Sequence, residues 1–387
     1  MPDIKRKIRV VFDHFYYASI IKKAVAQLNE RSIVATPTID WQMPLFQRPQ
    51  HLAQQLSQLG YDFFYLTTNH EEDQVHGLKK LATNLFISNQ YRRFINEAQA
   101  GWFLILAGQP LVTLEQIVAL KKRGAKIIYD YADEINEEIA RSEKGTSLIF
   151  ERHKQIKKLG LADLVLCTSQ KLYQEMEPFF AAEKILYCPN GVDYENFVGL
   201  AKGRSTPDDL KSIIESKKPI VGYYGALAKW IDYDYLKELA QKKPNCELIL
   251  IGLDYDGSLG KSRLLELSNV HYLGVKKYQE LPRYAKHFDV ALIPFVRGEI
   301  AQATSPLKFF EYMALEIPTV VTKDLQECAQ YKTTLVAESK SDFVKKVEQG
   351  MKSGRQKELK KKYQIIAQAN TWQVRAKQID QAIKALN

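Results

Sequence analysis

The sequence predicts an α/β protein made of two doubly wound, Rossmann-like domains that face a central cleft. Three observations support this fold class. Short apolar runs alternate with helix-period segments along most of the chain, a pattern typical of parallel sheets covered by helices on both faces. The alternation stops at a polar stretch near residue 200 and then restarts. The 387 residues are also enough for two domains of ordinary size.

The first half contains seven apolar runs that we expect to be strands. An opening strand or arm (IRVVF) and a helix (YYASIIKKAVAQLNE) precede them, and the helix-period segment QRPQHLAQQLSQLG follows the first run. In that segment Leu52, Leu56 and Leu59 fall on one face. The seven strand candidates are SIVATP, YDFFYLTT, NLFIS, FLILAG, KIIYDY, DLVLCTS and KILYCPNG.

The second half repeats the alternation after a polar interval. Residues 199–218 are rich in Gly, Ser and Pro and predict a linker with one short helix. The expected domains are therefore 1–198 and 219–370, and the last helix, 371–387, is expected to pack back on the first. Doubly wound sheets bind ligands at the carboxyl ends of their strands, so sites are expected in the cleft. The strand candidates here are PIVGYYGA, CELILIG, NVHYLG, DVALIPF, PTVVT and TTLVAE.

The charge balance favours anionic partners. Lysine and arginine number 55 against 45 acidic residues, giving a net charge of +10 and a pI near 9.1. Nucleic acid, acidic lipid and phosphorylated metabolites all fit this excess. The basic residues form short clusters without interleaved aromatic residues, which argues against nucleic acid and is compatible with solvated helix faces.

Composition also sets expectations about location and metals. The N-terminus lacks the long apolar segment of a signal peptide, and no stretch approaches the ~20 apolar residues that span a bilayer. We therefore expect a cytoplasmic protein with room for peripheral contact at the inner membrane face. The four cysteines are scattered and the seven histidines show no metal-ligand spacing, so we expect buried thiols and no metal site.

The segment TSPLKFFEYMALEIPTVVT places a carboxylate near a helix start. Ser305 is expected to be the N-cap and Pro306 the first helical residue. Glu311 falls on or beside the apolar stripe of that helix. Free backbone N–H groups with a carboxylate one turn further suit the phosphate and ribose of a nucleotide. Alternatively, Glu311 lies at the boundary between the apolar and polar faces of the helix and pairs with Lys308.

Two segments of the first domain offer polar groups at strand ends. In DWQMPLFQRPQHLA, Arg48 and the start of the following helix suit an anion, and His51 lies in the same first turn. The alternative is a solvated arginine beside a helix-start proline. YDYADE carries three carboxylates, of which Asp133 is our candidate for binding sugar hydroxyls or for acid–base work. Asp133 or Glu134 could instead cap the next helix.

Glycines and a lysine mark the start of the second domain. CPNGVDYENF places a turn directly after a strand. In GYYGALAKW, Gly225 would let a ligand approach the backbone, and Lys229 follows within reach of a phosphate. The alternative for Lys229 is a solvated side chain.

Two further motifs imitate known chemistry. DYDGS, which begins at Asp254, resembles the nucleophile motif of haloacid-dehalogenase phosphatases, and its D-x-D could also hold a metal-bound diphosphate. A polar loop with an Asx-type turn is the interpretation we prefer. LGKS imitates the end of a P-loop, but Tyr255 stands where the first glycine is needed, so we reject it.

Four segments together resemble the GT-B glycosyltransferases of the family-4 type. They are PNGVDYENF, VGYYGALAKW, NVHYLGVKKYQELPRYAKHFDVALIPF and SPLKFFEYMALEIPTVVT, and the resemblance covers nearly the whole chain. QRPQHLAQQLSQLG is similar to a subgroup that acts in bacterial envelope polysaccharide synthesis, including teichuronic-acid-type transferases.

The resemblance implies a nucleotide-diphosphate sugar as donor, bound on the second domain, and an acceptor-binding first domain. Glu311 would accept hydrogen bonds from the ribose hydroxyls. It implies a retaining transfer to a glycan or lipid-linked acceptor, with no cofactor or metal and with contact to an anionic membrane surface. Asp133, His51 and Lys229 would have catalytic or charge-offsetting roles. The other donor-site residues would be Thr304, Ser305, Pro306, Leu307, Lys308, Gly225, Gly274, Val275 and Arg48.

Two departures from the family pattern keep alternatives open. Ala303 stands where the family has a second glutamate, so Thr304 or Ser305 would contact the sugar instead, or activity is lost. The glycine-rich loop of the first domain is replaced by MPLFQRPQ. The alternatives are a GT-B sugar-nucleotide epimerase, a catalytically degenerate nucleotide-sugar-binding partner protein, and a magnesium-dependent phosphatase that uses Asp254.

Overall fold

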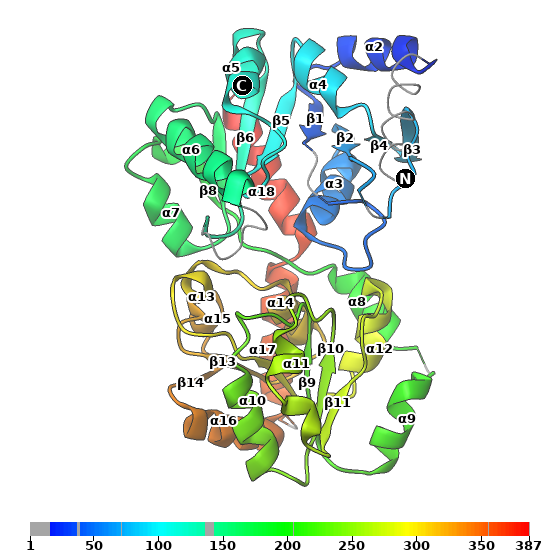
Figure 1. Cartoon of the computed structure of the whole chain (residues 1–387), viewed down its shortest axis with the longest axis vertical. Coiled ribbons are helices and arrows are strands. Elements are labelled where there is room, and N and C mark those ends of the chain that lie inside the picture. Colours follow the sequence, from blue (N-terminus) through cyan, green and yellow to red (C-terminus); the bar gives the residue numbers. More distant parts are fainter. Residues whose placement is uncertain are drawn as a thin grey trace. The chain divides into compact units, whose positions relative to one another are not determined.

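A computed structural model describes residues 16–36, 39–70, 72–135, 143–203, 205–354 and 356–386. Its contacts divide the chain into two units (Figure 1). Unit 1 comprises Met1–Pro189 and Arg375–Asn387, and unit 2 comprises Asn190–Val374. The stretch predicted as a linker therefore belongs to unit 2, where it carries helix α9 (Asp208–Glu215). The predicted opening strand IRVVF lies outside the described residues.

Unit 1 contains an eight-stranded sheet with the order β3-β4-β2-β1-β5-β6-β7-β8. Neighbouring strands are parallel except β3 and β4. The seven predicted strands are confirmed, but the sequence did not reveal β3. Its side chains are half-buried or exposed, so LKKLA forms no apolar run. The strands are β1 (Ser32–Ala35), β2 (Asp62–Leu66), β3 (Leu78–Ala82), β4 (Leu85–Ser88), β5 (Trp102–Leu106), β6 (Lys126–Tyr131), β7 (Leu164–Cys167) and β8 (Ile185–Tyr187).

The helices of unit 1 include the end of the chain. Tyr61 donates a hydrogen bond to Asp380 at 2.9 Å, and the Lys126 ammonium donates to the Leu386 carbonyl at 3.2 Å. These contacts attach the last helix to strands β2 and β6, far away in the sequence. The helices are α2 (Ala18–Ala26), α3 (Arg48–Gln58), α4 (Tyr91–Glu97), α5 (Leu114–Lys122), α6 (Glu143–Leu159), α7 (Gln170–Met176) and α18 (Trp372–Ala385), the last of which begins in unit 2.

Unit 2 contains a six-stranded parallel sheet with the order β11-β10-β9-β12-β13-β14. Counted from the first strand of the unit this is 3-2-1-4-5-6, the Rossmann order, which reverses between β9 and β12. All six predicted strands are confirmed. They are β9 (Ile220–Tyr224), β10 (Glu247–Ile251), β11 (Val270–Tyr272), β12 (Val290–Ile293), β13 (Thr319–Thr322) and β14 (Leu335–Ala337).

The helices of unit 2 cover both faces of this sheet (Figure 1). Besides α9 they are α8 (Tyr194–Ala201), α10 (Tyr233–Lys242), α11 (Ser258–Lys261), α12 (Leu281–Ala285), α13 (Glu299–Ala303), α14 (Leu307–Ala314), α15 (Gln326–Ala329), α16 (Lys340–Ser353) and α17 (Lys357–Ala369).

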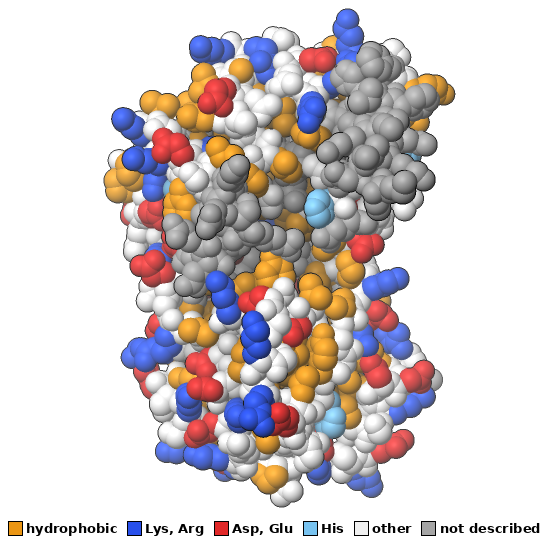
Figure 2. Space-filling view, in the orientation of Figure 1, with side chains coloured by type: hydrophobic (Ala, Val, Ile, Leu, Met, Phe, Trp, Pro, Cys, Tyr) orange, Lys and Arg blue, Asp and Glu red, His pale blue; other side chains and the backbone are white. Residues whose placement is uncertain are grey.

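The charged side chains do not form a single-sign field on the face drawn in Figure 2. Basic and acidic groups are interspersed over both units, with apolar side chains between them. Many of them are paired, as in the Lys121–Asp163 and Lys340–Asp234 ion pairs at 2.6 Å. Within the described ranges, no helix has the length and apolar character needed to cross a bilayer.

Candidate functional site

Helix α14 begins beside the point where the strand order of unit 2 reverses. Its first residue is Leu307, and Pro306, which has extended backbone angles, occupies the N-cap position. The prediction that Ser305 caps this helix is therefore wrong. The Ser305 hydroxyl instead accepts the Asn190 N–H at 3.2 Å, and the Asn190 amide donates to the Ser305 carbonyl at 2.6 Å. Asn190 thus fixes the approach to α14, in which the N–H groups of Leu307 and Lys308 precede the first hydrogen bond of the helix, from the Phe309 N–H to the Pro306 carbonyl at 3.1 Å.

Glu311 is buried one turn inside α14, with 2% of its surface exposed. Its Oε2 accepts a hydrogen bond from the Tyr224 hydroxyl at 2.7 Å, and Tyr224 is the last residue of β9. Burial raises the pKa of Glu311 to about 7, against the lowering effects of Tyr224, Lys308 and Tyr278. A buried carboxylate at the carboxyl end of the first strand is placed to accept ligand hydroxyls.

Lys308 lies in the first turn of α14 and is only partly exposed. Its ammonium sits over the rings of Tyr223 and Phe295, 5.2 and 5.6 Å from their centroids. Burial lowers the pKa of Lys308 to about 8, with Glu311 opposing the shift. The lysine stem passes close to Gly225, since a Cβ on that residue would lie 2.6 Å from Lys308 Cε. The structure therefore brings Gly225, Lys308 and Glu311 together.

The ends of three neighbouring strands are joined through glycine backbone. A Cβ on Gly252 would lie 1.9 Å from the Gly225 carbonyl oxygen, so this approach needs glycine. The Gly252 N–H in turn donates to the Gly274 carbonyl at 2.9 Å. Val275, which follows, is 44% exposed at the same edge of the sheet.

Lys229 and the D-x-D motif share one loop contact. The Lys229 side chain is exposed, and its backbone N–H donates to Asp256 at 3.0 Å. Asp256 also accepts the Ser258 N–H, and Asp254 accepts the N–H groups of Leu259 and Gly260. Both carboxylates therefore organise their own loop, which supports the Asx-type turn over a phosphatase nucleophile. Across the described residues, no three His, Cys, Asp or Glu side chains are grouped to hold a metal ion.

Arg48 is paired inside unit 1. Its Nε lies 3.0 and 3.1 Å from the two carboxylate oxygens of Asp130, and its Nη1 donates to the Cys188 carbonyl at 3.0 Å. Arg48 and Asp130 are 4% and 0% exposed. Burial alone would lower the pKa of Arg48, but Asp130 outweighs it and the pKa lies above its ordinary value. This corrects the prediction that Arg48 is available to an anionic ligand.

His51 is also buried, with 2% of its surface exposed. Its ring meets Phe46 edge-on at 4.8 Å between centroids. Burial lowers the pKa of His51 to about 3, so its neutral form prevails at neutral pH. The prediction of a polar residue facing a ligand is therefore corrected to a packed imidazole.

The loop that replaces the glycine-rich loop is tied down by two carboxylates. Asp40 accepts hydrogen bonds from Thr67 and from the N–H groups of His70, Glu72 and Asp73. Asp73 in return accepts the N–H groups of Trp41 and Gln42 at 2.7 and 3.0 Å. This reciprocal pairing fixes the loop that leads into α3.

Of the three YDYADE carboxylates, Asp133 alone is exposed. Glu134 accepts from Lys171 at 2.7 Å, and Asp130 is the partner of Arg48. The pKa of Asp133 is raised, first by the desolvating protein around it and then by Asp130. Asp133 is therefore the carboxylate of this motif that a ligand could reach.

The Thr304 hydroxyl is hydrogen-bonded within the protein. The Thr304 Oγ1 donates to the Ile300 carbonyl at 2.6 Å and closes the end of α13. Its oxygen lone pairs still allow it to accept a hydrogen bond. Ala303, which replaces the second family glutamate, is fully buried.

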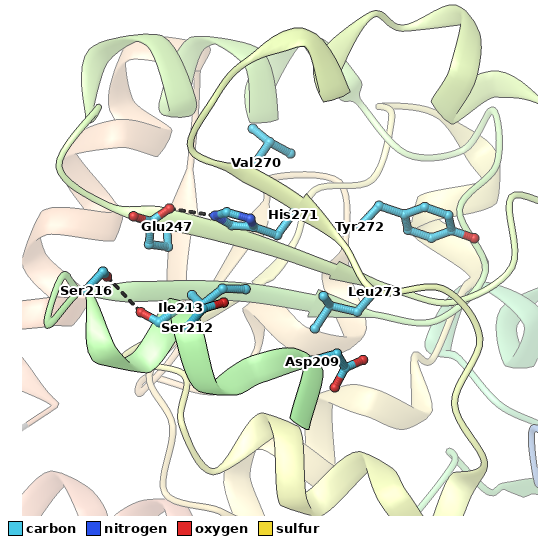
Figure 3. Close-up of a pocket in the computed structure, with 9 residues that line it drawn as sticks. All are labelled: Asp209, Ser212, Ile213, Ser216, Glu247, Val270, His271, Tyr272 and Leu273. Atoms are coloured by element: carbon cyan, nitrogen blue, oxygen red, sulfur yellow. Dashed lines mark hydrogen bonds and ion pairs between the residues drawn. The ribbon is translucent and has the colours of Figure 1, made fainter. Parts of the chain in front are cut away.

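Two open depressions of unit 2 lie away from these residues. One of about 420 Å³ lies between α9 and the edge strand β11 (Figure 3). There Glu247 accepts from His271, and Lys218 forms an ion pair with it, both at 2.7 Å. Tyr272 points away from this depression in Figure 3 and donates to the Gly252 carbonyl at 2.8 Å. The Glu247 carboxylate is thus satisfied within the fold.

The domain that carries Glu311 matches a known family. Residues 218–353 match the family of glycosyl transferases group 1. The matched residues all lie within unit 2. The sequence resemblance to the GT-B family is thereby confirmed.

A curated relative extends this similarity. The chain is 32% identical over 206 residues to TuaH of Bacillus subtilis (strain 168), which is named as a teichuronic acid biosynthesis glycosyltransferase. The match covers 51% of this chain and 50% of that protein, so the chain spans about half the length of the curated relative that it matches.

Solved structures confirm the GT-B fold class. Trehalose 6-phosphate synthase from Burkholderia multivorans has a TM-score of 0.68 at 11% identity, covering 92% of this chain and 98% of that one. Sucrose-phosphate synthase from Thermosynechococcus elongatus has 0.68 at 14%, covering 92% and 99%. Anabaena HepE, solved with UDP and glucose, has 0.63 at 15%, covering 92% and 99%. At these low sequence identities the structural similarity supports the fold alone.

Sequence reasoning missed the residues that hold the site in place. Tyr224, Tyr278 and Asn190 contact Glu311 or Ser305 across long sequence separations. The signal that could have found them is position, since Tyr224 ends strand β9 and Asn190 and Tyr278 lie in the segments after β8 and β11.

Proposed function

We propose that this chain transfers a sugar from a nucleotide-diphosphate sugar to an envelope glycan or lipid-linked acceptor. One observation carries the proposal. The start of α14 places the Lys308 ammonium and the buried Glu311 carboxylate together at the carboxyl end of β9, within the glycosyl transferase group 1 domain. A cation at a helix start and a carboxylate one turn further match the diphosphate and the ribose of one ligand.

Each group of this site has a distinct role in the proposal. Glu311 accepts hydrogen bonds from the ribose hydroxyls, because an ionised carboxylate is an acceptor only. The N–H groups of Leu307 and Lys308, with the Lys308 ammonium, bind the diphosphate. Gly225 lets the diphosphate approach the backbone, and the Lys229 ammonium adds charge from the adjacent loop.

The remaining donor contacts come from neighbouring loops. The backbone of Gly274 and Val275 borders the base, and Thr304 or Ser305 borders the sugar. These two positions replace the function of the second family glutamate, where this chain has Ala303.

The proposed chemistry is a metal-independent, retaining transfer. The bond between the anomeric carbon and the donor's diphosphate breaks, and the negative charge that develops on the leaving diphosphate is stabilised by the α14 N-terminus and by Lys308. The acceptor hydroxyl forms the new bond and gives its proton to the leaving phosphate. No protein base is then needed for the proton.

Unit 1 is proposed to bind the acceptor. Asp133 is exposed at the end of β6, and its raised pKa follows from the protein around it. The net charge of +10 supports an anionic acceptor or peripheral contact with an anionic membrane on its cytoplasmic side. The naming of TuaH supports an envelope polysaccharide, and the structure of Anabaena HepE with UDP-glucose makes UDP-glucose the first donor to test.

The test is a calorimetric titration of the full chain with UDP, GDP and dTDP, repeated on Glu311→Gln. The glutamine keeps the shape of the side chain and removes its charge. We expect one nucleotide to bind and the variant to lose about ten-fold in affinity, the 1.4 kcal/mol or more of a charge-assisted hydrogen bond. Glu247→Gln, which alters the carboxylate of the depression in Figure 3, is the matched control and should bind like the unaltered chain.

Turnover distinguishes transfer from the alternatives. A transferase releases nucleoside diphosphate faster when acceptor is present, whereas an epimerase converts the donor sugar with no acceptor. Binding without either reaction would identify a partner protein that only holds the nucleotide sugar. If no nucleotide binds, or if Glu311→Gln binds as tightly as the unaltered chain, the proposed donor site is wrong.

A further inference from the structure

Two tyrosines from separate elements hold the carboxylate of Glu311. Tyr224 ends β9 and donates to Glu311 Oε2 at 2.7 Å. Tyr278 lies in the short 3-10 turn Tyr278–Glu280 that follows β11, and its side chain also lowers the pKa of Glu311. Tyr224 and Tyr278 are 2% and 5% exposed. Two buried tyrosines therefore act on the carboxylate, one from the end of β9 and one from the turn after β11.

We propose that Tyr224 and Tyr278 are positioning residues of the donor site, which fix the direction of the Glu311 carboxylate so that its remaining lone pairs face the ribose hydroxyls. The inference rests on the proposed function. Each carboxylate oxygen has about two acceptor positions, so the hydrogen bond from Tyr224 to Oε2 leaves acceptor capacity for the ligand. Neither tyrosine needs to touch the nucleotide.

Tyr224 is itself held by the helix that carries Glu311. Its backbone N–H donates to the Tyr312 hydroxyl at 3.1 Å, and the two rings meet edge-on at 4.8 Å between centroids. Tyr312 follows Glu311 in α14. The strand end and the helix are therefore joined by two hydrogen bonds, in both of which Tyr224 is the donor and adjacent residues of α14, Glu311 and Tyr312, are the acceptors. Such a pair restricts rotation of the carboxylate more than one contact does.

Because Glu311 is titratable, its surroundings should determine how nucleotide affinity depends on pH. The titratable groups that face Glu311 are Tyr224 from β9, Tyr278 from the turn after β11, and Lys308 and Tyr312 from α14. Burial raises the pKa of Glu311, while the two hydroxyls and Lys308 lower it. Nucleotide binding needs the ionised carboxylate, so affinity should fall as the pH drops through the pKa of Glu311. Removal of a tyrosine hydroxyl should raise that pKa and move the fall to higher pH.

The experiment titrates Tyr224→Phe and Tyr278→Phe with the nucleotide that binds the unaltered chain, from about pH 5 to about pH 9. Each substitution keeps the ring and removes one hydroxyl. We expect each to weaken binding at neutral pH by about ten-fold and to raise the midpoint of the pH profile by roughly one unit. Combining Tyr224→Phe with Glu311→Gln should cost no more than Glu311→Gln alone, since the tyrosine acts through the carboxylate.

Tyr363→Phe is the matched control. Tyr363 is a fully buried residue of α17, and its hydroxyl has no hydrogen-bond partner within the described part of the chain. Its loss should leave both affinity and midpoint unchanged. Thermal unfolding of every variant separates loss of fold from loss of positioning, and either tyrosine variant that folds is sufficient for the test.

The outcomes separate this inference from the function on which it rests. If a nucleotide binds, Glu311→Gln weakens it, and both tyrosine variants keep the unaltered affinity and midpoint, the positioning role is overturned while the donor site stands. If affinity falls but the midpoint stays, or if losses add in the double variant, the tyrosines do not act through Glu311. If no nucleotide binds the unaltered chain, the proposed function and this inference both fail.

Discussion

Replacing Asp130 by asparagine should destabilise unit 1 by about 3–5 kcal/mol, the cost of removing one partner from a buried ion pair. The two side chains are 4% and 0% exposed, and three nitrogen–oxygen distances of 3.0–3.1 Å join them. Asparagine keeps the shape but removes the charge, which leaves the Arg48 guanidinium uncompensated in the interior. The Cys188 carbonyl accepts one of its hydrogen bonds and supplies no countercharge.

Hydrogen exchange of the β5 and β6 amides is the assay, because it reports unfolding of one unit in a chain with two. Glu97→Gln is the control, since it breaks the partly exposed Arg93–Glu97 pair at 3.4 Å on α4 and should cost no more than about 0.5 kcal/mol. A loss under about 1 kcal/mol for Asp130→Asn would refute the reasoning. The ion pair with Asp130 would then not be what holds Arg48 in the interior, and the prediction that Arg48 binds an anionic ligand would stand again.

Three further perturbations test other parts of the molecule. The pKa of Glu175 is lowered to about 2 because hydrogen bonds from α6 and β6 outweigh its burial, so Glu175→Gln should cost about 1–2 kcal/mol near neutral pH in urea unfolding. The ionised Glu175 contributes this stability above its ordinary pKa of 4.5, and the contribution disappears toward pH 2. A difference in unfolding free energy between the variant and the unaltered chain that stays constant down to that pH would contradict this. Gly225→Ala would place a Cβ 2.6 Å from Lys308 Cε at a φ of +130°, and calorimetry should show about a ten-fold loss of nucleotide affinity. Asn190→Ala keeps the backbone N–H but removes the side-chain hydrogen bond to the Ser305 carbonyl, and it should lower the unfolding free energy by about 1–3 kcal/mol. An unchanged urea midpoint would show that the approach to α14 is fixed by other contacts.

The sheets could be predicted because their strands are buried on both faces. A strand such as β10, all five of whose residues are buried, appears in the sequence as an apolar run of four residues after Glu247. Strand β3 has lysines on an edge and no such run, so it was missed. Strand order could not be deduced, because the hydrogen bonds between β9 and β12 join residues about seventy positions apart and leave no local pattern.

The site could be predicted only where its residues lie within one element. Glu311, Lys308 and the start of α14 are neighbours in the sequence, and the structure keeps them together. Arg48 was a candidate for ligand binding, yet it and Asp130, the first carboxylate of YDYADE, satisfy each other across 82 positions. Sequence spacing says nothing about such mutual pairing, so a charged side chain near a strand end is a candidate until its partner is known.

The division of the chain has a consequence for how the protein is made. Unit 1 is completed by Arg375–Asn387, which the ribosome adds after all of Asn190–Val374. The Tyr61–Asp380 hydrogen bond therefore cannot form while synthesis is still in unit 2. During translation unit 1 lacks α18 until the last residues are added, whereas all strands of unit 2 have by then been synthesised. Unit 1 is thus the first to begin leaving the ribosome, but unit 2 is the first whose fold can be completed.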